Sequence, residues 1–299
     1  MSTAALALTL IRCLPVSPAV LLARLLVLSY LAASRSIRIE IRHNYQTVFG
    51  RDRPGFWVEN GWQIGRNLAL MARMDSVIGR SLIDKAAVGA ENRVLCLLEQ
   101  ELQEESAGRR LVMVSFHFGM WEYLPFFFRR RGHRVALAVG RQRYRDFDSL
   151  LRGMRFAQGV RLVRSAGELF DKEQGGLVGF MLDNTGRGSM TFADSDQVVM
   201  RLPAPAFRVA RIDAGREQAW SDSKGGVVPA FCILERGRLR VRIYPEGDEN
   251  HVLGCLMAEV RRRPADWVFW GKARALKERG QGVEASSQRP KARSQRGSE

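Results

Sequence analysis

Short apolar runs alternate along the chain with longer segments in which apolar residues recur every three or four positions. The apolar runs predict strands at 111–116, 134–139, 160–163, 177–182, 227–233 and 239–243. The periodic segments predict helices at 64–80, 81–103, 118–131, 147–157, 166–174 and 251–263. Strands that alternate with helices of this length favour an α/β fold with a mixed, largely parallel sheet covered by helices on both faces.

The most apolar segment lies near the N-terminus. Residues 14–33, LPVSPAVLLARLLVLSYLAA, form a segment of about 20 residues, which is long enough to cross a bilayer as a helix. Pro15, Pro18 and Arg24 interrupt it, and a central arginine costs roughly 2.5 to 3.5 kcal/mol on insertion. A spanning helix, an interfacial helix, a cleavable signal peptide and a core helix that packs on the domain are therefore all open.

Three parts are expected along the chain. Residues 1–34 form an N-terminal apolar membrane-anchor segment, residues 35–274 one main domain, and residues 275–299 a basic disordered tail. Arg12 alone precedes the apolar segment, whereas three arginines follow it closely, namely Arg35, Arg38 and Arg42. By the positive-inside rule, the main domain is expected on the cytoplasmic side of a membrane.

The chain is strongly basic, with a net charge of +16. Such a surface attracts polyanions, which include nucleic acid, anionic lipid headgroups and acidic carrier proteins. Nucleic acid is not an expected partner, because the basic residues are spread over helices and tail and are not interleaved with aromatic residues on a sheet. The four cysteines and four histidines lack the spacing of a metal site or a disulfide framework, so no metal and no cofactor are expected.

The best candidate for reaction chemistry is His117, which ends the apolar run at 111–116 and is followed by Glu122. An unbroken helix would turn these two side chains about 140° apart, so their contact needs a turn between them. If the helix begins at Phe118 or Gly119, Glu122 can reach back to the imidazole. A carboxylate on one ring nitrogen would leave the other nitrogen free to take a proton from a hydroxyl. The alternative is a histidine at the edge of the core beside an unrelated surface glutamate.

Several sequence blocks resemble those of one family. The hexad HFGMWE, at 117–122, resembles the H-F-G-N-W-E or D block of the bacterial lipid A biosynthesis acyltransferases, which are the lauroyl and myristoyl transferases of the lysophospholipid acyltransferase superfamily. Further blocks follow in the expected order, and they are GGLVGFMLDN at 175–184, VVPAF at 227–231 and PADWVFWGKAR at 264–274. The resemblance covers most of residues 14–274. Met120 replaces the usual Asn, and Asn184 replaces the Gln of an Asp-Gln motif.

This resemblance implies an acyltransferase at the cytoplasmic face of the bacterial inner membrane. The donor would be an acyl-carrier protein thioester, or acyl-CoA, and the acceptor a hydroxyl of a glycolipid, most simply a lipid A precursor. His117 would be the base and Glu122 its orienting acid. The resemblance further implies substrate-binding roles for Arg155 and Asp183, beside which we place Arg141 and Asn184.

Transfer is expected to be direct, without an acyl-enzyme, because the chain has no GxSxG motif and Ser115 has no obvious base beside it. The backbone N–H groups near Phe118 and Gly119 are the expected donors to the oxyanion. Two alternatives stay open. The same chemistry could act on another lipid acceptor, such as a lysophospholipid, a mannosylated lipid or an amino-lipid, or the chain could be a non-enzymatic basic protein that binds membranes or nucleic acid.

Overall fold

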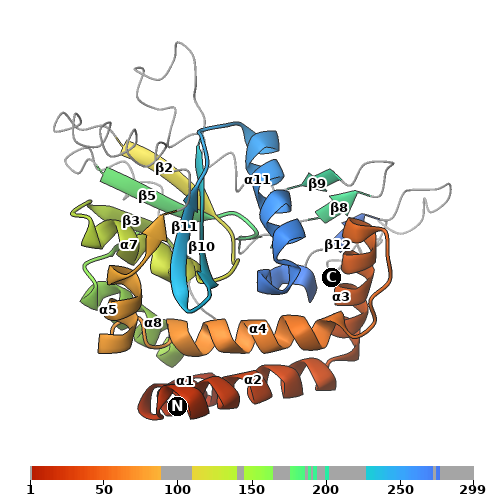
Figure 1. Cartoon of the computed structure of the whole chain (residues 1–299), viewed down its shortest axis with the longest axis horizontal. Coiled ribbons are helices and arrows are strands. Elements are labelled where there is room, and N and C mark those ends of the chain that lie inside the picture. Colours follow the sequence, from red (N-terminus) through yellow and green to blue (C-terminus); the bar gives the residue numbers. More distant parts are fainter. Residues whose placement is uncertain are drawn as a thin grey trace, which may run out of the picture.

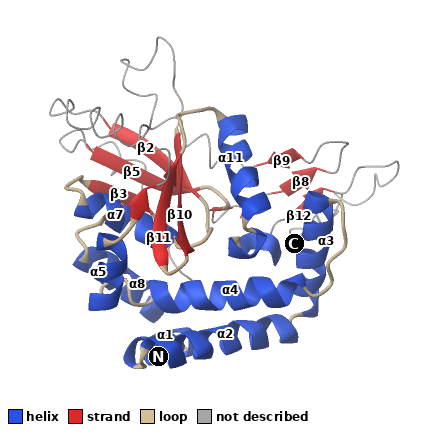
Figure 2. Cartoon of the chain, in the orientation of Figure 1, coloured by secondary structure: helices blue, strands red, loops and turns tan. Residues whose placement is uncertain are grey.

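A mixed, mostly parallel sheet lies at the centre of the fold (Figures 1 and 2). In this computed structural model the described residues are 2–88, 110–139, 145–163, 176–185, 188–189, 191–193, 199–201, 227–271 and 274–276. Within them the strand order of the main sheet is β1-β11-β10-β2-β5-β3-β4. The strands are β1 (Ala87–Val88), β2 (Arg110–Ser115), β3 (Val135–Ala138), β4 (Arg161–Val163), β5 (Gly176–Met181), β10 (Val228–Glu235) and β11 (Arg238–Ile243).

The predicted α/β class is confirmed. Neighbouring strands run parallel except in the β10–β11 hairpin. All six predicted strands are present, with bounds that differ from the predicted ones by at most two residues. Strands such as β2 and β10 were readable from the sequence because strands covered on both faces are apolar nearly throughout. Strand β11 instead alternates arginines with buried apolar residues.

The main helices on the domain are α4 (Phe56–Met71), α5 (Val77–Asp84), α7 (Leu124–Arg130), α8 (Arg145–Ala157) and α11 (Glu249–Arg262). The single helix predicted at 64–80 is wrong. Its range spans two helices separated by a turn, after which the Ser76 hydroxyl oxygen caps α5 by accepting a hydrogen bond from Gly79 N–H. The helix predicted at 81–103 is wrong at 87–88, which form β1, and its remainder beyond residue 88 lies outside the described residues, as does 166–174.

Smaller elements complete the described fold. Two short sheets are formed by β6 (Asn184–Thr185), β7 (Gly188–Ser189), β8 (Thr191–Ala193), β9 (Val199–Arg201) and β12 (Arg274–Leu276). Strand β12 contains the first two residues of the predicted disordered tail, so that boundary is too early. Residues 277–299 lie outside the described part of the chain.

Three helices precede α4 in the chain, namely α1 (Thr3–Cys13), α2 (Val16–Ala33) and α3 (Arg35–Phe49). Figure 1 shows α1 and α2 as a layer beneath α4, on the side of α4 away from the sheet. The helices α2 and α4 pack closely side by side, since a Cβ added at Gly65 would lie 2.5 Å from Arg24 Cα. Among the described helices, α2 is the one that is long and apolar enough to cross a membrane, by length and composition only.

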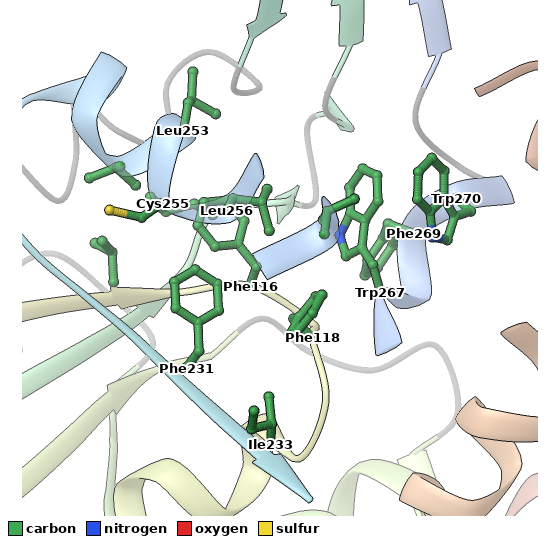
Figure 3. Close-up of a cluster of buried hydrophobic side chains, with 14 of the residues drawn as sticks. Phe116, Phe118, Phe231, Ile233, Leu253, Cys255, Leu256, Trp267, Phe269 and Trp270 are labelled. Atoms are coloured by element: carbon green, nitrogen blue, oxygen red, sulfur yellow. The ribbon is translucent and has the colours of Figure 1, made fainter. Parts of the chain in front are cut away.

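The two faces of β2 contribute to two separate apolar clusters, because successive side chains of a strand point to opposite faces. Val112, Val114 and Phe116 belong to the cluster that includes Trp267, whereas Met113 belongs to the cluster under α7. Figure 3 shows the first cluster, in which Phe116 stacks on Phe231 with ring centroids 5.9 Å apart. This packing brings the C-terminal 3-10 turns η3 (Pro264–Asp266) and η4 (Val268–Gly271) to the end of β2.

Candidate active site

The candidate site forms where β2 and β5 end side by side. These strands are parallel neighbours, and Ser115 pairs with Met181 in their register. His117 and Asp183 each follow two residues later, so the sheet brings them to the same edge. This is the edge at which sites of open α/β sheets gather.

Asp183 holds the imidazole of His117. The Nδ1 of His117 lies 2.7 Å from Asp183 Oδ1. Asp183 Oδ2 accepts hydrogen bonds from the His117 backbone N–H, at 2.8 Å, and from Trp267 Nε1–H, at 3.2 Å. The carboxylate is completely buried, and these three donors stabilise its charge there.

This arrangement fixes the tautomer of His117. An ionised carboxylate can only accept, so Nδ1 carries the hydrogen and Nε2 of the neutral ring is the acceptor. Within the described residues, no hydrogen bond engages Nε2. The ring lies between Trp121 and Phe269, with centroid distances of 5.3 and 4.8 Å, and its side chain is 23% exposed.

The predicted orienting role of Glu122 is wrong, because Asp183 already occupies Nδ1. The cause lies in the turn after His117, which does not lead directly into a helix. Gly119 adopts a left-handed conformation, with φ of 62°, and a Cβ at this position would lie 2.6 Å from the carbonyl oxygen of Cys232. The chain therefore first runs beside β10, and the 3-10 helix η1 (Trp121–Tyr123) begins only afterwards.

The expected oxyanion donors are also wrong. The N–H of Phe118 donates to the carbonyl of Phe116 at 2.6 Å, and the N–H of Gly119 donates to the carbonyl of Asp266 at 2.9 Å. Both groups are thus satisfied by the protein itself. A helix terminus at this point would have left such groups unpaired, but the turn does not form one.

Glu122 forms a bidentate ion pair with Arg155 on α8. Arg155 donates from Nε to Glu122 Oε2 at 3.0 Å and from Nη2 to Glu122 Oε1. Burial alone would raise the pKa of Glu122, but the charge and hydrogen bonds of Arg155, together with His117, lower it below its ordinary value. Burial likewise opposes the charge on Arg155, and Glu122 outweighs this and raises its pKa. Both side chains are therefore charged.

The other predicted site residues have different outcomes. A direct substrate contact by Asp183 is wrong, since this side chain is fully buried behind the imidazole. The substrate-binding role of Arg155 stays a prediction, and the structure places it beside the candidate base. Asn184 begins β6, immediately after Asp183. Arg141 lies outside the described residues.

His117, Glu122 and Arg155 line a cavity of about 350 Å³. Most of the remaining lining is apolar and comes from α1, α2, α4 and α8, and it includes Leu8, Ile11, Leu26, Leu68, Met71 and Leu151. A smaller cavity of about 50 Å³ shares Trp121, Glu122 and Arg155 with the first one. Ser115 lines this smaller cavity, but its hydroxyl donates to the carbonyl of Ala230 at 2.7 Å. It has no base beside it among the described residues.

No protein-family model matches the chain, and no curated protein matches it significantly.

In the described residues, no three His, Cys, Asp or Glu side chains gather as a metal ion would require. The groups around His117 support proton transfer, because an oriented neutral imidazole faces an apolar cavity that also holds one buried ion pair. The partner of His117 and the hydrogen bond from Trp267 were not predicted from the sequence. The signal for the first was available: His117 and Asp183 stand directly after two apolar runs, and neighbouring parallel strands end at one edge.

Proposed function

We propose that this protein is an acyltransferase in which His117 is the general base for transfer of a fatty acyl group from a thioester to a lipid hydroxyl. The observation that supports this most is the pairing of a buried carboxylate with a histidine that lines a large apolar cavity. The blocks that resemble lipid A acyltransferases point to the same chemistry.

In the proposed reaction, the acceptor hydroxyl donates its proton to Nε2 of His117 while its oxygen attacks the thioester carbonyl. The resulting imidazolium is stabilised by the Asp183 carboxylate on Nδ1. When the tetrahedral intermediate collapses, the C–S bond breaks and the leaving thiolate takes the proton back from Nε2. The enzyme ends in its starting state, and no covalent intermediate is needed.

The cavity suits a fatty chain. Its volume of about 350 Å³ lies in the range of small-molecule sites, and most of its walls are apolar. Arg155 uses Nε and Nη2 for Glu122, so its Nη1 edge can face an oxyanion, either that of the intermediate or a phosphate of a substrate. Glu122 then positions Arg155 rather than His117.

For the substrates, we infer an acyl-carrier protein thioester or acyl-CoA as donor and a glycolipid, most simply a lipid A precursor, as acceptor. The site of action would be the cytoplasmic face of the bacterial inner membrane. These assignments rest on the family resemblance and on the apolar N-terminal helix. Met120 and Asn184 differ from the residues that the resembled family has at these positions. Another lipid acceptor is therefore the second candidate.

Lipid mass spectrometry tests the activity and the acceptor together. Lipids from cells that express the chain are compared with lipids from cells that lack it and from cells that express His117→Ala. We expect one lipid class to gain an acyl chain only with the unmodified protein. Identical lipid profiles in all three would contradict the proposal, whereas a gain in a class other than lipid A precursors would support the alternative acceptor.

A further inference from the structure

The outer surface of α1 and α2 is apolar and has no partner among the described residues. Four large side chains on it are between 47% and 51% exposed, and they are Leu6, Leu10, Leu21 and Leu25. The helix α2 is strongly apolar, with a mean hydropathy of 1.9, yet only 17% of its residues are buried. Large exposed apolar patches of this kind mark interaction sites. We call these four residues the apolar outer face.

Both charged side chains of residues 1–33 turn away from the apolar outer face. They are Arg12 and Arg24. Arg12 forms a bidentate ion pair with Asp75 at 2.8 and 3.0 Å. Arg24 stacks on Trp62 of α4, with its Cζ 4.3 Å from the ring centroid, and donates to the Trp62 carbonyl at 3.3 Å. The arginine that would be costly in the middle of a membrane-spanning helix is thus placed against the domain.

Polar contacts fix α1 and α2 to the domain at the junction between the two helices. Besides its pair with Asp75, Arg12 donates to the carbonyl of Ala72 at 2.8 Å. In the opposite direction, Arg73 donates to the carbonyls of Ile11, at 2.5 Å, and Leu14. For α2 to cross a bilayer alone, these contacts and the close packing with α4 at Gly65 would have to break. The 18 residues of α2 span only about 27 Å, slightly less than the hydrocarbon core.

We propose that α1 and α2 lie flat on the membrane and insert the apolar outer face into one leaflet, so that the protein is bound to one side without crossing the bilayer. A lipid bilayer fits this surface better than a second copy of the chain does, because α2 is as hydrophobic as a membrane helix. The exposed Arg35 begins α3 directly after α2, and the chain carries a net charge of +16; both favour anionic lipids.

This orientation also provides access to the site. Leu26 and Leu68 line the cavity of His117, and they are 43% and 39% exposed. A lipid could therefore pass from the leaflet into the cavity beside these two side chains without entering water. This access route rests on the proposed function, whereas the flat orientation of α1 and α2 does not.

Protease access to a tag tests the orientation. A polar epitope tag is placed before Met1 of the full chain, and a second tag after Glu299 is the control for the cytoplasmic side. We expect both tags to survive protease added to intact spheroplasts and both to be removed from inverted membrane vesicles. Removal of the N-terminal tag from intact spheroplasts would show that α2 spans the membrane, and loss of the tag by processing would show a signal peptide; either result overturns the proposal.

Vesicle binding tests the surface. Leu25→Glu places a charge on the apolar outer face, and Ile78→Glu on α5 is the matched control at a 39% exposed apolar residue outside it. We expect Leu25→Glu to weaken binding of the purified full chain to phosphatidylglycerol vesicles at least about tenfold, and Ile78→Glu to leave it unchanged. Equal binding by the two variants would overturn the proposal. So would a dimer in solution that Leu25→Glu dissociates without any effect on vesicle binding. Neither result depends on acyl transfer, which is tested separately with His117→Ala.

Discussion

At the scale of single residues, the basicity and orientation of His117 depend on which carboxylate is bonded to its imidazole. Asp183 is buried and bonded to Nδ1, whereas Glu122 is bonded to Arg155. The two carboxylates thus have separate roles: Asp183 orients the base His117, and Glu122 pairs with the cation Arg155. Substitutions that remove one charge and keep the shape distinguish these roles.

Asp183→Asn should lower the acyl-transfer rate by roughly 10² to 10⁴-fold, because the amide no longer stabilises the imidazolium and can favour the wrong tautomer. The ¹⁵N chemical shifts of the His117 ring report the tautomer directly. We expect them to change in Asp183→Asn and to stay as in the unmodified protein in Glu122→Gln. The reverse pattern would return the orienting role to Glu122.

Glu122→Gln should destabilise the fold by about 3 kcal/mol, since it leaves the buried guanidinium of Arg155 without its counter-charge. Urea denaturation at neutral pH measures this. Replacing both partners by apolar residues of similar volume, as in Glu122→Leu with Arg155→Met, should recover much of the loss. A single variant as stable as the unmodified protein would contradict a buried ion pair.

The pH dependence follows from the lowered pKa of Glu122. Its unfolded-state pKa is near 4.5 and its folded-state pKa lies below that, so its contribution to stability is complete above about pH 4.5 and is lost as the pH falls through the folded value. The difference in melting temperature between the unmodified chain and Glu122→Gln should therefore be constant near neutrality and shrink in acid. A difference in melting temperature that grows towards low pH would contradict a lowered pKa of Glu122.

At the scale of elements, the turn between β2 and η1 determines the geometry of the site. Gly119 combines a positive φ with close backbone contact, while Gly132, with φ of 90°, has nothing within 4 Å of an added Cβ. Alanine substitutions at these two glycines therefore distinguish the cost of a positive φ from the cost of a steric clash.

Gly119→Ala should therefore be clearly more destabilising than Gly132→Ala, which carries only the cost of the left-handed conformation, about 1 kcal/mol. Thermal or urea denaturation of both variants gives the comparison. Gly119→Ala should also reduce activity, because the chain beside His117 has to shift. Equal losses of stability in the two variants would mean that the contact with the Cys232 carbonyl is unimportant.

The same turn marks the limit of what could be predicted from the sequence. The central strands were predictable, since burial on both faces imposes apolar runs, and the candidate base was found at the end of one of them. The left-handed residue at Gly119 has no such signature, so the following helix was expected too early and Glu122 was expected to reach His117. Local spacing also could not reveal that Asp183, distant in sequence, is the partner, because that depends on β2 and β5 being neighbours in the sheet.

At the scale of the whole molecule, the N-terminal helices and the site form one arrangement. The helices α1 and α2 line the cavity that contains His117, and the apolar outer face lies on the same two helices. The sequence left open whether this segment spans a membrane, lies on it or packs on the domain. The contacts of Arg12 and Arg24 with the domain show that it packs there, while its remaining surface is left apolar.

The most direct test of the central claim is the rate of acyl transfer from an acyl-carrier protein thioester to an extracted lipid acceptor by purified His117→Ala. His43→Ala is the control, because His43 is an exposed histidine on α3. We predict that His117→Ala loses at least about 10²-fold in rate while staying folded at the assay temperature, and that His43→Ala is unaffected. Full activity in His117→Ala would contradict the proposed base and the account built on it.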